Sequence, residues 1–221
     1  MFGGSERKAQ RWARDYRTRL VREEVTSLER VLDLGNLELL DLRLPDLVGS
    51  PLSVQALSED LQVSHRAIEN WITIFERLLA VYRLAPFGAP TVRALRHARK
   101  LYFFDWSRVA GEAARFENLI AGHLLKWVHF LEDTEGRDIE LRYFRDRDGH
   151  EVDFVVVENR RPILMVEVKS SDQPIDHGLR FLSAKFPKIA AWQVSRSGTK
   201  DYVGENGIRV APAARLLATL V

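Results

Sequence analysis

The sequence predicts an α/β protein, α+β overall, with a helical N-terminal part followed by an α/β layer. Apolar side chains recur at helical spacing within residues 6–48 and again within residues 53–79. Residues 141–169 instead form short apolar runs separated by turn residues, which is typical of strands. A helix over 178–185, a strand over 188–194 and a last helix from residue 212 complete the predicted layer.

The composition excludes several classes of protein. The chain has 221 residues, of which 46% are hydrophobic, and its 33 basic and 31 acidic residues give a net charge of +2. These values exclude an obvious disordered tail, a collagen and a disulfide mini-protein, and the length predicts one or two domains. No apolar run reaches the roughly 18 residues of a membrane span, the N-terminus does not resemble a signal peptide, and cysteine is absent. We therefore expect a cytoplasmic protein that makes no membrane contact.

Three segments are expected along the chain. Residues 1–48 predict a helical linker segment, whose helix over 37–48 ends at the turn Gly49–Pro51. Residues 49–110 predict a winged helix-turn-helix: Ser53 and Ser64 each cap a helix, and strands at 80–84 and 100–105 flank a basic loop. Residues 111–221 form the third segment. No phosphate-binding P-loop is found in the chain, so it carries no ATPase motif.

The winged segment is the candidate nucleic-acid surface. No acidic residue lies between Thr91 and Lys100, and phosphate contacts require basic side chains that are free of acids. The predicted DNA contacts are Arg66, Asn70, Arg93, Arg96, Arg99 and Lys100. The alternative is a plain helical hairpin with solvated charges. Trp71, Phe103 and Phe104 are expected in the core.

The third segment carries the residues that suggest chemistry. Glu117 lies at the edge of the apolar stripe of a helix predicted over 113–131. Glu167 and Lys169 project from one face of their strand, and Asp153 lies on the preceding strand. We expect the helix to cover the sheet face that carries these three residues. Two carboxylates on paired strands, with a third from a helix, can bind Mg²⁺ or Mn²⁺, and a nearby lysine can act on a water at a phosphodiester. The alternative is a structural ion pair at the end of a sheet.

These motifs resemble a known superfamily. Gly149–Val156, followed by Val166–Ser171 and preceded by Phe116–Asn118, resemble the PD-(D/E)xK restriction-endonuclease-like superfamily. The order of motifs over nearly the whole chain, including Lys100–Asp105, resembles the DUF4143-type domain found C-terminal to prokaryotic AAA-type ATPases. The resemblance implies a nuclease-like α/β domain over 111–221. Val152 departs from it, because the superfamily's proline would stand there.

The resemblance also implies roles for the site residues. Asp153 and Glu167 would be the metal ligands, Lys169 the catalytic lysine and Glu117 the acid on the helix. Two hypotheses stay open: a Mg²⁺-dependent nuclease that acts on DNA, or a non-catalytic module that binds DNA or protein and serves an ATPase. The ATPase half is missing, so the chain is either a fragment or a stand-alone descendant.

Two further motifs are interpreted as structural. Asp146–Gly149 lacks the later ligands of a calcium loop, so we expect a hairpin turn there. Asp172, Asp176 and His177 are expected to be solvated surface residues.

Overall fold

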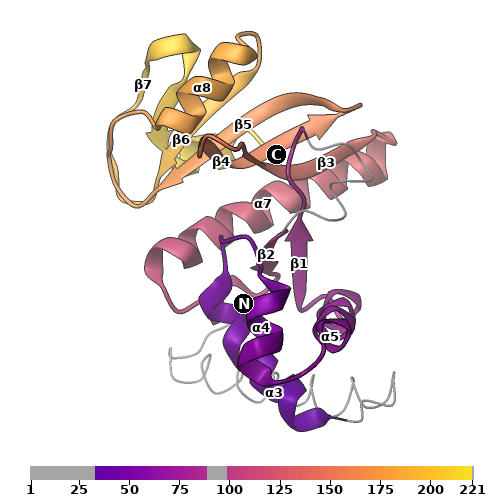
Figure 1. The fold of residues 1–221 in the computed structure, drawn as a ribbon. Coiled ribbons are helices and arrows are strands. Elements are labelled where there is room, and N and C mark those ends of the chain that lie inside the picture. Colours follow the sequence, from indigo (N-terminus) through magenta and orange to yellow (C-terminus); the bar gives the residue numbers. More distant parts are fainter. Residues whose placement is uncertain (1–32, 89–98, 221) are drawn as a thin grey trace, which may run out of the picture.

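The computed structural model describes residues 33–88 and 99–220. Within them, an N-terminal helical part lies on one side of a long helix, and a mixed sheet lies on the other side (Figure 1). This is the mixed α/β class that the sequence predicts. The helix predicted at the start of the chain, together with Arg93 and Arg96, lies outside the described residues. No described helix has both the length and the apolarity that crossing a membrane requires.

The N-terminal part follows the predicted order of elements. Asp33 caps the first helix by accepting a hydrogen bond from the Asn36 N–H, and Ser53 and Ser64 cap the next two. The predicted helix 37–48 is instead an α-helix followed by a 3₁₀ turn that contains Pro45. The elements are α3 (Leu34–Arg43), η2 (Leu44–Leu47), α4 (Val54–Leu61), α5 (His65–Arg77), β1 (Val81–Leu84), β2 (Lys100–Phe103) and η3 (Trp106–Arg108). Strands β1 and β2 pair in an antiparallel arrangement.

The C-terminal part is built on the long helix α7 and a mixed sheet. The elements are α7 (Glu112–Glu135), β3 (Ile139–Arg145), β4 (Glu151–Glu158), β5 (Arg161–Lys169), α8 (His177–Lys185), β6 (Ala190–Ser195), β7 (Tyr202–Val203), η4 (Glu205–Gly207), β8 (Arg209–Pro212) and α9 (Ala213–Leu217). The strand order is β3-β4-β5-β6-β8-β7, and β8 runs parallel to β6. The sequence reading missed β7, which has two residues, and β8, which has four.

Two helices cover opposite faces of this sheet (Figure 1). Ile120 and Leu124 of α7 belong to the core cluster that contains Phe154 and Val166. Leu179 and Leu182 of α8 instead belong, with Val155 and Met165, to a second cluster. Since Glu167 alternates with Val166 along β5, it lies on the face that α8 covers. The expectation that the Glu117 helix covers the face of Glu167 and Lys169 is therefore wrong.

A bulge in β4 allows Asp153 to contact residues on both faces of the sheet. The pairs Arg142–Val155 and Phe144–Val152 leave two residues of β4, Asp153 and Phe154, opposite one residue of β3. Pairing between β4 and β5 is described only as far as Phe154 and Val166, so the two strands separate beside Asp153. The Asp153 carboxylate can thus meet side chains from both faces at the end of the sheet.

Candidate functional site

The separated ends of β4 and β5 place two acidic residues side by side. Oδ2 of Asp153 accepts a hydrogen bond of 2.9 Å from the Val168 N–H, and Oε2 of Glu167 accepts one of 3.2 Å from the Asp153 N–H. Each carboxylate therefore takes up an amide that would otherwise belong to the ladder between the strands. The structure brings Asp153 and Glu167 together, as the sequence predicts.

Glu117 reaches this place from α7. Its Oε1 accepts a hydrogen bond of 2.8 Å from the hydroxyl of Tyr102, which is buried on β2. Gly49 lies over the same carboxylate: a β-carbon there would be 2.8 Å from Oε2, and the φ of this residue is +78°. A side chain is thus excluded at Gly49 both by the carboxylate and by the backbone conformation. The N-terminal part of the chain therefore encloses Glu117.

Lys169 lies on the α8 side of the site. Its Nζ donates to Oε1 of Glu167 at 2.7 Å and to Oδ2 of Asp176 at 2.8 Å. Asp176 also caps α8 through its other oxygen, which accepts from the Gly178 N–H at 2.7 Å. The expectation that Asp176 is only a solvated residue is wrong, because it fixes Lys169 relative to α8. Its position just before a helix was the available signal.

Lys100 departs most from the sequence prediction. Its side chain is only 1% exposed, so it cannot be a surface contact to phosphate. Its Nζ instead lies 2.6 Å from Oε1 of Glu151, 3.7 Å from Oδ1 of Asp153 and 4.0 Å from Oε1 of Glu117. Lys100, the last residue of the basic stretch that was predicted as one surface, therefore lies in the acidic site. Sequence reasoning missed Glu151, Tyr102 and Lys100 as neighbours of that site.

Burial and mutual repulsion shift the ionisation of these carboxyls. Burial, together with the charge of Asp153, raises the pKa of Glu117 to about 7 and that of Glu167 to about 8. Burial also raises the pKa of Asp153. Although burial opposes it, the charges of Glu167 and Asp176 raise the pKa of Lys169, so its amine is protonated at neutral pH.

The donors at this site suit a hard divalent cation in part. Asp153 and Glu167 offer neighbouring carboxylate oxygens, and Mg²⁺ is commonly held through one or two carboxylates while it keeps several waters. Burial raises the pKa values of both carboxyls despite the nearby lysines, and a bound cation would oppose that shift. Among the described residues, however, only Asp146, Asp148 and His150 place three ligand atoms within 4.8 Å of one another. Glu117 is thus near the pair without completing a three-carboxylate cage.

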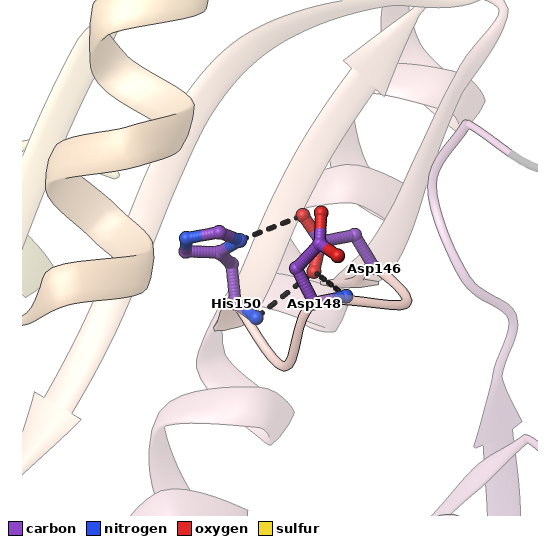
Figure 2. Close-up of side chains that lie close together, drawn as sticks. All are labelled: Asp146, Asp148 and His150. Carbon is purple, nitrogen blue, oxygen red and sulfur yellow. Dashed lines mark hydrogen bonds and ion pairs between the residues drawn. The ribbon is translucent and has the colours of Figure 1, made fainter.

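That hairpin cluster is shown in Figure 2. Oδ1 of Asp146 accepts from the N–H groups of Asp148 and His150, both at 2.9 Å, and its Oδ2 lies 2.8 Å from Nδ1 of His150. The His150 ring stacks on Phe181, with the ring centroids 3.8 Å apart. These bonds form the predicted turn between β3 and β4, so the geometry of the cluster is explained by the hairpin itself.

The remaining predicted nucleic-acid residues are only partly placed. Arg66 and Asn70 are exposed near the start of α5, and Arg99 is half-buried just before β2. Arg93 and Arg96 lie outside the described residues. Trp71 and Phe103 are buried, as expected, but Phe104 is 41% exposed, so its assignment to the core is wrong.

Comparison with protein families divides the chain into two matched segments. Residues 3–112 match the family model described as a domain of unknown function (DUF8612). The comparisons with curated proteins and with solved structures gave no match. Residues 113–216, which carry Glu117, Asp153, Glu167 and Lys169, match the family model described as a domain of unknown function (DUF4143). The sequence motifs suggested a resemblance to that family over nearly the whole chain, and the match covers these residues.

Proposed function

We propose that this protein binds DNA and hydrolyses a phosphodiester bond at the site of Glu117, Asp153, Glu167 and Lys169, with Mg²⁺ or Mn²⁺ as cofactor. The observation that carries the proposal is the pairing of Asp153 and Glu167 at the separated ends of β4 and β5, next to the Lys169 amine. Burying two carboxylates side by side is energetically costly, and the pairing of two strands does not require it. The resemblance to the PD-(D/E)xK superfamily supports the same reaction.

Each residue has a defined part in the proposed chemistry. Asp153 and Glu167 would hold the cation, which when bound supplies Lewis acidity to the phosphate. Lys169 is an ammonium fixed by two carboxylates, so it would donate hydrogen bonds to a phosphate oxygen or an attacking water. It cannot remove a proton from that water. Glu117 would tune the charge of the site through Asp153.

The test combines cleavage with metal binding. We expect the native chain to nick supercoiled DNA in Mg²⁺ or Mn²⁺, and Asp153→Asn, Glu167→Gln and Lys169→Ala to abolish nicking. Metal should raise the thermal stability of the native chain and of Lys169→Ala, but not of the two ligand variants, since ligand binding stabilises only a folded chain that can bind. Glu132→Gln, an exposed change on α7, serves as the matched control. Nicking that survives in all three variants, or an absence of any metal effect, would refute the proposal.

A second candidate function is a non-catalytic module that binds DNA or a protein. This function is favoured by the ion pairs of the site, because Lys100 and Lys169 already neutralise carboxylates as they would in a structural charge cluster. In that case DNA or protein binding should survive Asp153→Asn and Glu167→Gln, without metal dependence. Nicking should stay absent even when a partner ATPase is added.

A further inference from the structure

The inference concerns Lys100, which enters the acidic site from the N-terminal part of the chain. Its amine lies among Glu151, Asp153 and Glu117 at 2.6, 3.7 and 4.0 Å. The same amine lies 5.4 Å from the centre of the Tyr143 ring, on β3. No other described lysine amine forms ion pairs with Asp153, so this contact joins the N-terminal part to a proposed metal ligand.

The backbone holds Lys100 firmly in this position. It is the first residue of β2, where it pairs with Leu84, and it forms an isolated bridge with Pro51. The N–H of Leu52 donates to the carbonyl of Arg99 at 2.8 Å. The next residue but one, Tyr102, donates to Glu117. The position of the amine is therefore set by β1, β2 and the turn that follows η2.

The charges around the amine leave room for a second cation. Glu151 is shared with the surface residue Arg145 at 3.6 Å. Four carboxyl groups then remain at the site, those of Glu117, Asp153, Glu167 and Asp176. Two ammonium groups face them, those of Lys100 and Lys169. Although burial opposes it, these acids raise the pKa of Lys100, so the amine stays charged. When all four carboxyls are ionised, the described residues of the site thus keep an excess of negative charge.

A divalent cation bound at Oδ1 of Asp153 would be repelled by the Lys100 ammonium, which lies 3.7 Å from the same oxygen. Mg²⁺ binds its oxygen ligands at about 2.1 Å and would repel a positive charge in contact with the same carboxylate. Oδ2 of Asp153 is occupied by the Val168 N–H, and its other oxygen, Oδ1, is the one nearest Lys100. A cation that binds Oδ1 of Asp153 would therefore lie beside the Lys100 ammonium and be repelled by it.

We propose that Lys100 is a built-in competitor of the divalent cation: its ammonium neutralises Asp153, Glu117 and Glu151 while the cation is absent, and it must withdraw when the cation binds. This inference rests on the proposed function, since it presumes a cation at Asp153 and Glu167. It makes the N-terminal part of the chain a regulator of metal loading through β2. Anything that displaces β2 would strengthen metal binding at a distance from the ligands.

The first test measures metal affinity directly, by calorimetric titration with Mn²⁺. We expect Lys100→Met, which keeps the length of the side chain and removes its charge, to bind Mn²⁺ about tenfold more tightly than the native chain. Lys126→Met, an exposed change on α7, should leave the affinity unchanged. The tight binding should disappear when Asp153→Asn is added to Lys100→Met.

The outcomes separate this inference from the proposed function. Equal affinity in the native chain and Lys100→Met, lost in Asp153→Asn, would overturn the role of Lys100 and leave the metal site intact. An absence of Mn²⁺ binding in both folded proteins would overturn the metal site and the competitor together.

A second test uses the native chain, because Lys100→Met leaves three carboxylates without their amine and can fail to fold. Acetylation of lysines by an amine-reactive ester is followed by mass spectrometry, with and without saturating Mn²⁺. Lys100 should be protected without metal, as its 1% exposure requires, and should become reactive when Mn²⁺ is bound. Lys126 should react equally in both conditions. Continued protection of Lys100 in the Mn²⁺-saturated chain would overturn the proposal.

Discussion

At the scale of single residues, this protein keeps several ionisable side chains away from water. Glu167 and Lys100 are 6% and 1% exposed, and each is compensated by a partner of opposite charge. Removing one partner of such a pair costs more than the pair itself contributes, because the other charge stays buried. The charge balance of the site therefore depends on each of its ionisable side chains, and a change of pH disturbs it directly.

The pH dependence of stability follows from the raised carboxyl pKa values. Glu167 titrates near 4.5 when unfolded and at about 8 when folded, so the folded chain binds the extra proton between these values. Each extra proton lowers the free energy of unfolding by about 1.4 kcal/mol per pH unit as the pH rises. We expect the metal-free chain to lose stability from pH 5 to pH 8, as measured by urea unfolding.

The variant Glu167→Gln provides the corresponding comparison. It cannot titrate, so the loss of stability between pH 5 and pH 8 should be smaller than in the native chain. Glu132→Gln, at an exposed position, should show the native pH dependence. If Glu167→Gln showed the same pH dependence as the native chain, the Glu167 carboxyl of the native chain would already be ionised at pH 5.

At the scale of elements, α7 joins the two halves of the chain through one buried amide. Oδ1 of Asn118 accepts from the Phe103 N–H at 2.8 Å, and its Nδ2 donates to the Phe103 carbonyl at 2.7 Å. Asn118 thus acts as a neighbouring strand for the end of β2. Glu117 immediately precedes Asn118 on α7, so this amide also fixes the position of the Glu117 side chain relative to β2.

Replacing Asn118 should therefore be costly. Asn118→Leu leaves both backbone groups of Phe103 buried without partners, which should lower the free energy of unfolding by about 2–4 kcal/mol. Asn70→Ala, on the exposed face of α5, should change it by less than about 0.5 kcal/mol. Urea unfolding of both variants measures the difference, and equal stabilities would show that the amide does not hold β2.

The start of α8 is equally constrained by its contact with β4. A β-carbon on Gly178 would lie 2.0 Å from the Glu151 carbonyl oxygen, so Gly178→Ala must push α8 and Asp176 away from the sheet. We expect a loss of about 2 kcal/mol or more in the free energy of unfolding. Gly122→Ala, within α7, meets nothing within 4 Å and should instead stabilise the chain by about 0.5–1 kcal/mol. Thermal unfolding that ranks the two variants in the opposite order would contradict this packing.

At the scale of the whole molecule, the proposed DNA surface and the acidic site are separate features of the N-terminal and C-terminal parts. Arg66 is exposed on α5, whereas Lys100 is buried in the acidic site and contributes no surface charge. Among the predicted contacts, only the arginines can therefore contribute to the electrostatic part of any DNA binding. Each phosphate contact contributes about 0.9 to the slope of log affinity against log salt.

This separation predicts how the salt dependence of DNA binding responds to mutation. Changing Arg66 and Arg99 together to glutamine should flatten the slope by about 1.8, in a filter-binding or anisotropy titration over a range of salt. Lys100→Met should leave the slope unchanged, because its amine does not face the solvent. A flatter slope in Lys100→Met, with the arginine variant unaffected, would reverse the assignment.

The sequence by itself determined the α/β class, the two capped helices, the hairpin at Asp146–Gly149 and the juxtaposition of Asp153 with Glu167. Each depends on local signals, such as caps, turn residues and alternation along a strand, that neighbouring residues are sufficient to specify. Only the tertiary structure decided that α7 and α8 cover opposite faces, that a bulge turns Asp153 toward both, and that Lys100 points inward. The physical reason is that a lysine next to basic neighbours has the same sequence pattern whether it faces water or carboxylates. Its direction is fixed by partners, Glu117, Glu151 and Asp153, that lie at least 17 positions away along the chain.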